Sequence, residues 1–112
     1  MLIADFTLAD GQPVACAVSG HAEYTEENPA GQILCASVSS AVQLTCNTLT
    51  ECFGADVEIC EQPDAGSQNQ LSFRLRKPDA VQIQMMQGLL IHFQALSEDF
   101  AGLMTVQFRE MH

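Results

Sequence analysis

A histidine and a cysteine stand close together in the sequence, in a setting that suits nucleophilic catalysis. His21 follows Gly20 where a strand is expected to give way to a loop, so its imidazole should be exposed and able to turn. Cys35 is expected in the first turn of a helix, where unpaired amides and the helix dipole stabilise a thiolate. An imidazole nearby can deprotonate such a thiol and later protonate a leaving amine. The two side chains could therefore cleave a peptide bond.

The spacing of the two residues permits this pairing without requiring it. They are 14 positions apart, and an extended chain of that length spans about 46 Å, so the segment between them can fold back. Residue types alone also allow an inert, buried Cys35 and a surface His21. On spacing alone, this structural interpretation is the favoured one.

The other four cysteines, Cys16, Cys46, Cys52 and Cys60, are expected to be buried and inert. The total of five is odd and no pair is spaced C-x-x-C, which disfavours a disulfide framework and a zinc site. A redox sensor would need a resolving cysteine near Cys35, and Cys46 lies about 16 Å further along the helix. We expect no metal and no cofactor.

The pattern of apolar residues and turn signals predicts a single domain over residues 1–112. Strands are expected at 2–8 and 13–19, joined by a tight turn at Asp10-Gly11, and again at 56–61, 70–76 and 102–109. Helices are expected at 32–53, ended by Gly54, and at 79–97, opened by Pro78-Asp79. The order ββαββαβ predicts an α/β (α+β) fold of two layers, a five-stranded, mostly antiparallel sheet with two helices on one face.

Periodicity also predicts which side chains face the core. In the last three strands these are Val57, Ile59, Leu71, Phe73, Leu75, Met104, Val106 and Phe108. In the second helix they are Val81, Met85, Leu89, His92, Phe93 and Leu96, which makes His92 a core or interface residue. The segment 20–31, which contains Gly20, Pro29 and Gly31, is predicted to be a loop.

The composition and net charge indicate which kinds of molecule the protein can bind. The chain has 112 residues, 47% of them hydrophobic, and a formal net charge of −10. Direct binding of nucleic acid is disfavoured because phosphate contacts need cations, whereas a basic protein would be attracted. No apolar run is long enough to cross a membrane and the start lacks the pattern of a signal peptide, so we expect a cytoplasmic location.

His21 and Cys35 each lie within a short sequence motif. Gly20-His21-Ala22, followed after a loop by Ile33-Leu34-Cys35-Ala36-Ser37-Val38-Ser39, resembles the ribosomal-processing cysteine proteases of the Prp family. That family has a G-H-A motif, a loop of about ten residues, and a motif close to D-I-V-C-A-A-V-S. The resemblance covers nearly the whole chain in length and element order. Gln32 stands where the family usually has Asp, and Ser37 where it usually has Ala or Gly.

The resemblance implies a specific activity. Such enzymes remove a short N-terminal extension from a large-subunit ribosomal protein, a basic partner, by cutting after a pair of phenylalanines. His21 matches the family's catalytic base and Cys35 its nucleophile. Ser39 matches a hydroxyl four residues after the nucleophile, and the implied assembly is a homodimer.

Two further roles are expected near this pair. Gly20 would support His21, and amides near Ala36 at the start of the helix would stabilise the oxyanion. The alternative to a protease is a non-catalytic ribosome-assembly module that only binds the ribosomal protein, and Gln32 is the feature that favours it.

Overall fold

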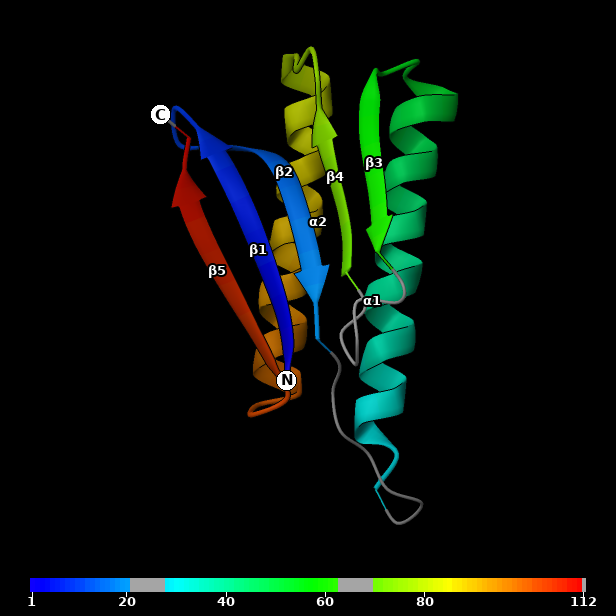
Figure 1. The fold of residues 1–112 in the computed structure, drawn as a ribbon, viewed down its shortest axis with the longest axis vertical. Coiled ribbons are helices and arrows are strands. Elements are labelled where there is room, and N and C mark those ends of the chain that lie inside the picture. The colour runs from blue at the N-terminus through cyan, green and yellow to red at the C-terminus, as the bar shows by residue number, and fades with distance from the viewer. Residues whose placement is uncertain (21–27, 63–69, 112) are drawn as a thin grey trace.

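The computed structural model describes residues 1–20, 28–62 and 70–111. Its elements follow the predicted order, with one addition after the first helix (Figure 1). They are β1 (Leu2–Ala9), β2 (Gln12–Ser19), α1 (Ala30–Asn47), η1 (Thr48–Cys52), β3 (Val57–Gln62), β4 (Gln70–Leu75), α2 (Ala80–Asp99) and β5 (Met104–Glu110).

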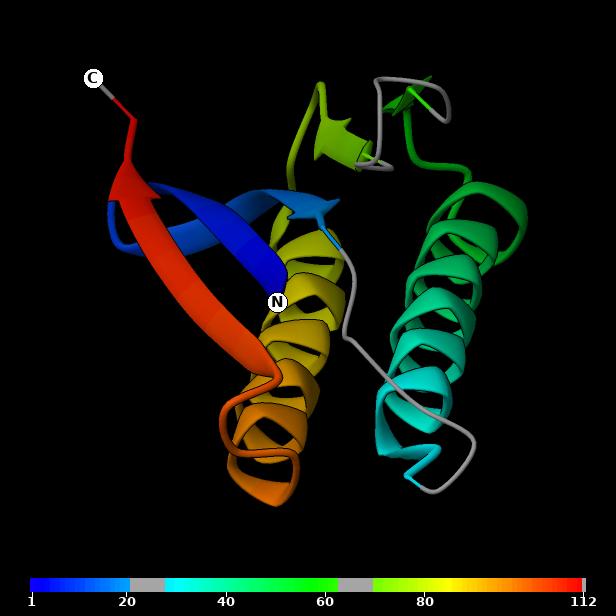
Figure 2. The same ribbon diagram turned by 60° about the horizontal axis from the view of Figure 1, so that its bottom comes forward.

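The five strands form one mixed sheet in the order β3-β4-β2-β1-β5. The pairs β1–β2, β2–β4 and β3–β4 are antiparallel, and β1–β5 is parallel. Both helices cover the same face of this sheet, as Figure 2 shows. The predicted two-layer fold is therefore confirmed.

The first hairpin and the core follow the alternation of the sequence. Asp10 and Gly11 have φ values of 53° and 78°, the pair of positive angles that a tight two-residue hairpin turn requires. The inward side chains Leu2, Ala4 and Phe6 of β1 are buried. The ring of Phe6 meets that of Phe93 in α2 edge to face, with centroids 6.0 Å apart. This contact joins the two layers through apolar burial and aromatic geometry.

The first helix differs from the prediction at both ends. It starts at Ala30 because the side chain of Asn28 accepts a hydrogen bond from the Ala30 N–H at 3.2 Å, while the carbonyl of Pro29 accepts the first helical bond, from Ile33. After Asn47 the chain widens into the π-helical turn η1, where the Phe53 N–H reaches the carbonyl of Thr48. The expected single helix over 32–53 is therefore wrong in its start and its last turn.

Several side chains predicted to face the core are exposed instead, namely Val81, His92, Ile59 and Phe108. On α2 the buried stripe is Gln82, Met86, Leu89, Phe93 and Leu96. The stripe is rotated relative to the prediction because only one side of α2 rests on the sheet, while Met85 and His92 lie toward α1. Ile59 and Phe108 belong to the two edge strands, which the helices cover least.

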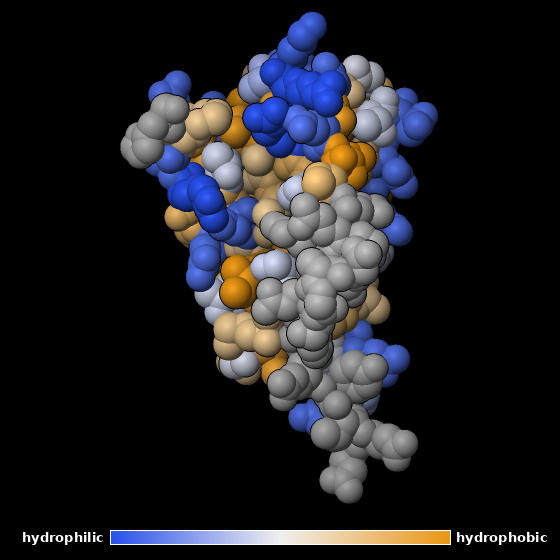
Figure 3. Space-filling view, viewed as in Figure 1, coloured by the Kyte–Doolittle hydropathy of each residue, from blue (hydrophilic) through white to orange (hydrophobic). Residues whose placement is uncertain are grey.

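The face of the sheet away from the helices is open to solvent (Figure 3). Hydrophilic residues gather over the upper end of β3 and β4 and again over β5, and between these two groups the surface includes hydrophobic residues, drawn tan and orange. Ion pairs account for part of these groups: Arg74 donates to Glu58 and Arg109 to Asp5. The side chains of Arg74, Glu58 and Arg109 are exposed, whereas that of Asp5 is only 16% exposed. The exposed Arg74–Glu58 pair contributes little to stability, but both pairs add charge to this face.

Gly20, the residue after β2, has a backbone conformation that other residues rarely adopt. Its φ is +76°, and a Cβ at this position would overlap the carbonyl oxygen of Met1 and lie 4.0 Å from the Cα of Leu2. The close approach follows from the pairing of Ile3 with Ser19 at the end of the hairpin. The chain therefore leaves the sheet toward residue 21 in a direction that the start of β1 enforces.

Gly20 and Gly102 form a matched pair for testing this constraint. Gly102 also has a positive φ, +86°, but apart from the glycine and its two chain neighbours no atom of the described residues lies within 4 Å of the position that a Cβ would take there. We expect Gly102→Ala to cost about 1 kcal/mol from the backbone angle alone, and Gly20→Ala roughly 2 kcal/mol or more, because the start of β1 must also move. Urea unfolding followed by circular dichroism measures both; equal losses would show that the contact with Met1 does not matter.

Candidate active site

Cys35 lies in the second turn of α1, five residues after the helix starts at Ala30. Its side chain is partly buried and packs against the core, between the fully buried Leu34 and the exposed Ala36. The prediction that Cys35 lies in the first turn is therefore wrong, and the extra turn comes from the earlier start of the helix. The helix dipole acts mainly within the first turn, so Cys35 lies beyond the position where its effect is strongest.

Ala36 lies beyond the free amides of the helix. The amide that first donates along the helix is that of Ile33, so the N–H groups without a helical partner precede it, and the N–H of Ala30 bonds to Asn28. The helical pattern places the Ala36 N–H in the interior of α1, where a carbonyl one turn earlier accepts it. The expectation that this amide is a free oxyanion donor is therefore not supported.

Ser39 lies one turn after Cys35, on the same side of α1, because side chains four positions apart are neighbours on a helix. It is exposed, and in the described part of the chain its hydroxyl has no hydrogen-bond partner. Ser37, by contrast, donates to the carbonyl of Ile33 at 2.9 Å. The hydroxyl of Ser39 is therefore available to a group that approaches Cys35.

His21 lies outside the described residues, and so do the other residues between Gly20 and Asn28. What the structure does describe is the peptide immediately before it. The strand β2, which Gly20 follows, ends toward the same end of the molecule as the start of α1, the helix that carries Cys35 (Figure 1). Of the first motif only Gly20 is described, and it lies toward the end of the fold at which α1 begins.

The other cysteines divide into two kinds. Burial raises the pKa of the Cys16 thiol far above its ordinary value, with smaller contributions from Cys46 and Asp5, and it raises the pKa of Cys46 to about 11. These two thiols are neutral at physiological pH and enclosed by the core, which makes them poor nucleophiles. Cys52 and Cys60 are exposed, so the prediction that they are buried is wrong: η1 turns Cys52 outward, and β3 is an edge strand.

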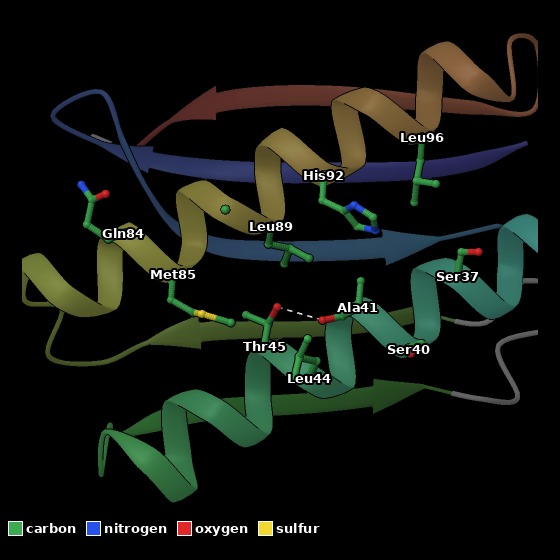
Figure 4. Close-up of a pocket in the computed structure, with 11 residues that line it drawn as sticks. Ser37, Ser40, Ala41, Leu44, Thr45, Gln84, Met85, Leu89, His92 and Leu96 are labelled. Carbon is green, nitrogen blue, oxygen red and sulfur yellow. Dashed lines mark hydrogen bonds between the residues drawn. The ribbon is translucent and has the colours of Figure 1, made fainter.

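A groove runs between the two helices on the side away from the sheet (Figure 4). It encloses about 520 Å³ and its walls include Ala41 and Leu44 of α1 and Met85, Leu89 and His92 of α2. Cys35 does not line it. The sequence pattern did not predict this groove, because the same apolar periodicity would result if the helices packed tightly.

Two further properties concern the described residues only. No group of three or more His, Cys, Asp or Glu side chains in 1–20, 28–62 and 70–111 is arranged to hold a metal ion. Neither of the described helices combines the length and the apolar character that crossing a membrane would require.

Comparison with known families decides the class of protein. The model of the family described as cysteine protease Prp matches residues 1–104. The chain belongs to the Prp family of cysteine proteases. It is therefore a protease that uses a thiol, and the predicted resemblance is confirmed. A comparison with curated proteins gave no match.

Solved structures agree with this fold. The chain is similar to SMU.848 from Streptococcus mutans, at 20% identity and a TM-score of 0.84, over 99% of this chain and 96% of that one. It is also similar to the essential ribosomal processing protease Prp from S. aureus in complex with a substrate peptide, at 17% identity and a TM-score of 0.78, over 97% and 100% of the two chains. A second structure of the S. aureus protein holds a covalently linked product peptide, at 17% identity and a TM-score of 0.76, over the same shares.

The burial of the thiols predicts their order of alkylation. At pH 8 a thiol with a pKa of about 11 is only ~0.1% thiolate, and Cys16 and Cys46 are also covered by the core. We expect iodoacetamide to modify Cys52 and Cys60 at least about 100 times faster than Cys16 and Cys46. Peptide mapping by mass spectrometry after timed quenching measures the four rates.

The same reaction in 8 M urea, a chosen denaturing condition, is the control, because all the thiols should then react at similar rates. If Cys46 reacted as fast as Cys52 in the folded protein, the core around β2 and α1 would be open to solvent, contrary to the structure.

Proposed function

We propose that this Prp-family protease is a ribosomal processing enzyme that removes the short N-terminal extension of a large-subunit ribosomal protein by cutting after a Phe-Phe pair. The observation that carries the proposal is the family match over residues 1–104, which includes both sequence motifs. The relative from S. aureus is described as a ribosomal processing protease and has been solved with substrate and product peptides. The net charge of −10 suits a basic ribosomal protein as substrate, and the proposed place of action is the cytoplasm.

In the proposed mechanism Cys35 is the nucleophile and His21 the general base. The imidazole takes the proton from the thiol, and the thiolate attacks the carbonyl carbon of the scissile bond. The carbon–nitrogen bond breaks as the imidazolium gives that proton to the leaving amine, which leaves a thioester on Cys35. His21 then deprotonates a water molecule that attacks the thioester, releasing the carboxylate product and restoring the thiol.

The remaining proposed site residues have supporting roles. Gly20 directs the chain into His21, because its positive φ and its contact with Met1 restrict the exit from β2. Ser39, exposed one turn after Cys35, is proposed to donate a hydrogen bond to the bound peptide or to the reacting sulfur. Ala36 is proposed to contribute its small exposed side chain beside Cys35, which leaves room for the substrate backbone.

The catalytic assignment predicts the effect of two substitutions on a peptide that spans a Phe-Phe-Ala junction. The wild-type protein should cut after the aromatic pair, and Cys35→Ala and His21→Ala should each lower kcat by about 1,000-fold or more. Ser39→Ala should lower it by about tenfold, the loss expected for one hydrogen bond. Mass spectrometry of timed samples identifies the products and gives the rates.

Cys52→Ala is the matched control, because Cys52 is an exposed thiol of the same chain that lies at the other end of the α1–η1 segment. Its rate should equal that of the wild type. If Cys35→Ala still cut the peptide at the wild-type rate, the nucleophile would be assigned wrongly. If the wild-type protein cut other peptides but not this one, the substrate would be wrong and the protease assignment would stand.

We also propose that the enzyme is a homodimer in which the groove between α1 and α2 is covered by a second copy. Among the described residues no Asp or Glu lines this groove, and Leu44 is largely exposed at its rim. Two copies of an acidic chain can approach most easily where neither presents carboxylates.

Sedimentation velocity tests the dimer. The wild type should sediment at about twice the chain mass of 12.2 kDa. Leu44→Glu should sediment as a monomer, because it places like charges at the contact, whereas Val81→Glu, at another exposed apolar position, should stay dimeric. A monomeric wild type would exclude the dimer, and a dimeric Leu44→Glu would place the contact elsewhere.

A further inference from the structure

The last strand of the sheet, β5, is covered by α2 at its start but not at its end. In Figure 2 β5 begins beside the end of α2 and then diverges from it toward the C-terminus. The side chains on the inner face of β5 become more exposed in the same direction. Met104 is 5% exposed, Val106 is partly buried and Phe108 is 48% exposed. The twist of the sheet explains this loss of cover, because each strand is rotated relative to its neighbour while α2 is straight.

An apolar surface remains where the cover is lost. Phe108 lies beside a groove of about 350 Å³ that also includes Leu8 of β1 and Leu90 and Ile91 of α2. Ile91 is 65% exposed. The ring of Phe108 is stacked on that of Phe6, with centroids 6.4 Å apart, so one side of the ring is supported by the core. A supported, exposed aromatic ring of this kind is a frequent centre of binding energy at protein interfaces.

The backbone of β5 is free on one side within the described part of the chain. There the strand pairs only with β1, in an unbroken parallel register from Leu2–Met104 to Leu8–Glu110. Alternate N–H and C=O groups of such an edge strand point outward, and natural proteins usually protect them with a proline, a bulge or an outward lysine. β5 contains no proline or lysine, its register has no shift, and Arg109 is held by Asp5. Its edge can therefore accept another strand.

The charges at the rim of this surface are negative. Glu110 points to the same side of β5 as Phe108, because side chains two positions apart share a face. It accepts a hydrogen bond from the Gly11 N–H at 3.2 Å, which brings it to the turn that contains Asp10. Arg109, the cation of this strand, is on the opposite face in its ion pair with Asp5. A partner for this edge should therefore carry positive charge.

We propose that the free edge of β5, together with Phe108, Ile91, Glu110 and Asp10, binds an extended basic polypeptide segment as a sixth strand of the sheet. Main-chain hydrogen bonds to β5 would hold the segment, as in other cases of strand addition. An apolar side chain would rest on Phe108 and Ile91, and flanking lysines or arginines would face Glu110 and Asp10. We call this surface the β5 edge surface. It is additional to the proposed cleavage site and could bind a part of a basic substrate protein that lies away from the bond that is cut.

The test uses the intact protein and a fluorescein-labelled peptide of alternating sequence, KVKFKVK, followed by fluorescence anisotropy. We expect saturable binding that weakens at least about tenfold between 50 and 300 mM salt, two chosen conditions, because the rim charges are exposed. The acidic peptide EVEFEVE should not bind. A KVKFKVK peptide N-methylated at alternate residues on its bonding edge should bind at least about tenfold more weakly, since it cannot pair with β5.

Variants locate the binding. Ile91→Gln and Phe108→Ser should each weaken KVKFKVK binding by about tenfold or more, and Asp10→Asn and Glu110→Gln by about threefold each. Val81→Gln is the control, because Val81 is a similarly exposed apolar residue of α2 that is absent from this groove. Ile91→Gln keeps a good helix former on the surface of α2, so it tests the proposal even if Phe108→Ser were to lower stability.

Three results would overturn the proposal: unchanged affinity in Ile91→Gln with the wild-type fold, equal binding of the N-methylated peptide, or sedimentation in which the wild type is a dimer and the folded Phe108→Ser variant is a monomer. Binding of KVKFKVK does not depend on cleavage and should be the same in Cys35→Ala. A failure here is therefore distinguishable from a failure of the proposed protease mechanism.

Discussion

The structure depends on the way two helices cover one face of a twisted five-stranded sheet. Contacts such as that between Phe6 and Phe93 hold the layers together, and they bury the inner side chains of the central strands. A two-layer protein can bury only one face of its sheet, so the other face must be polar and the edges are covered unevenly. This arrangement explains why some side chains are buried, others are partly buried and others are exposed.

The reactivity of the cysteines follows from the same arrangement. Cys16 on β2 and Cys46 on α1 lie in the covered interior, where burial raises the pKa of each thiol. Cys35 lies near the start of α1, partly buried and flanked by the exposed Ala36. For the nucleophile proposed at Cys35, the second turn of a helix that rests on the sheet would supply both a defined position and access to substrate. Access rather than the helix dipole therefore separates Cys35 from the enclosed thiols.

The backbone is restricted near Gly20 and uncovered along the edge strand β5. At one end Gly20 lies so close to the backbone of Met1 that a side chain at this position would overlap it, which restricts the backbone at Gly20. At the far edge β5 diverges from α2 and exposes Phe108 and its own backbone. The first is a close backbone contact directly before the proposed base, and the second is an uncovered surface.

The sequence by itself determined the order of elements, the hairpin turn at Asp10-Gly11 and the family, because these depend on local periodicity, turn chemistry and short motifs. It did not determine the helix start, where Asn28 and Pro29 extend α1 to Ala30, or the exposure of Ile59 and Phe108. Alternation along a strand assigns a side chain to a face, but only the position of the strand in the sheet and the path of the helices decide whether that face is covered. The placement of Cys35 one turn deeper in its helix, and the open edge of β5, are therefore results of the tertiary structure.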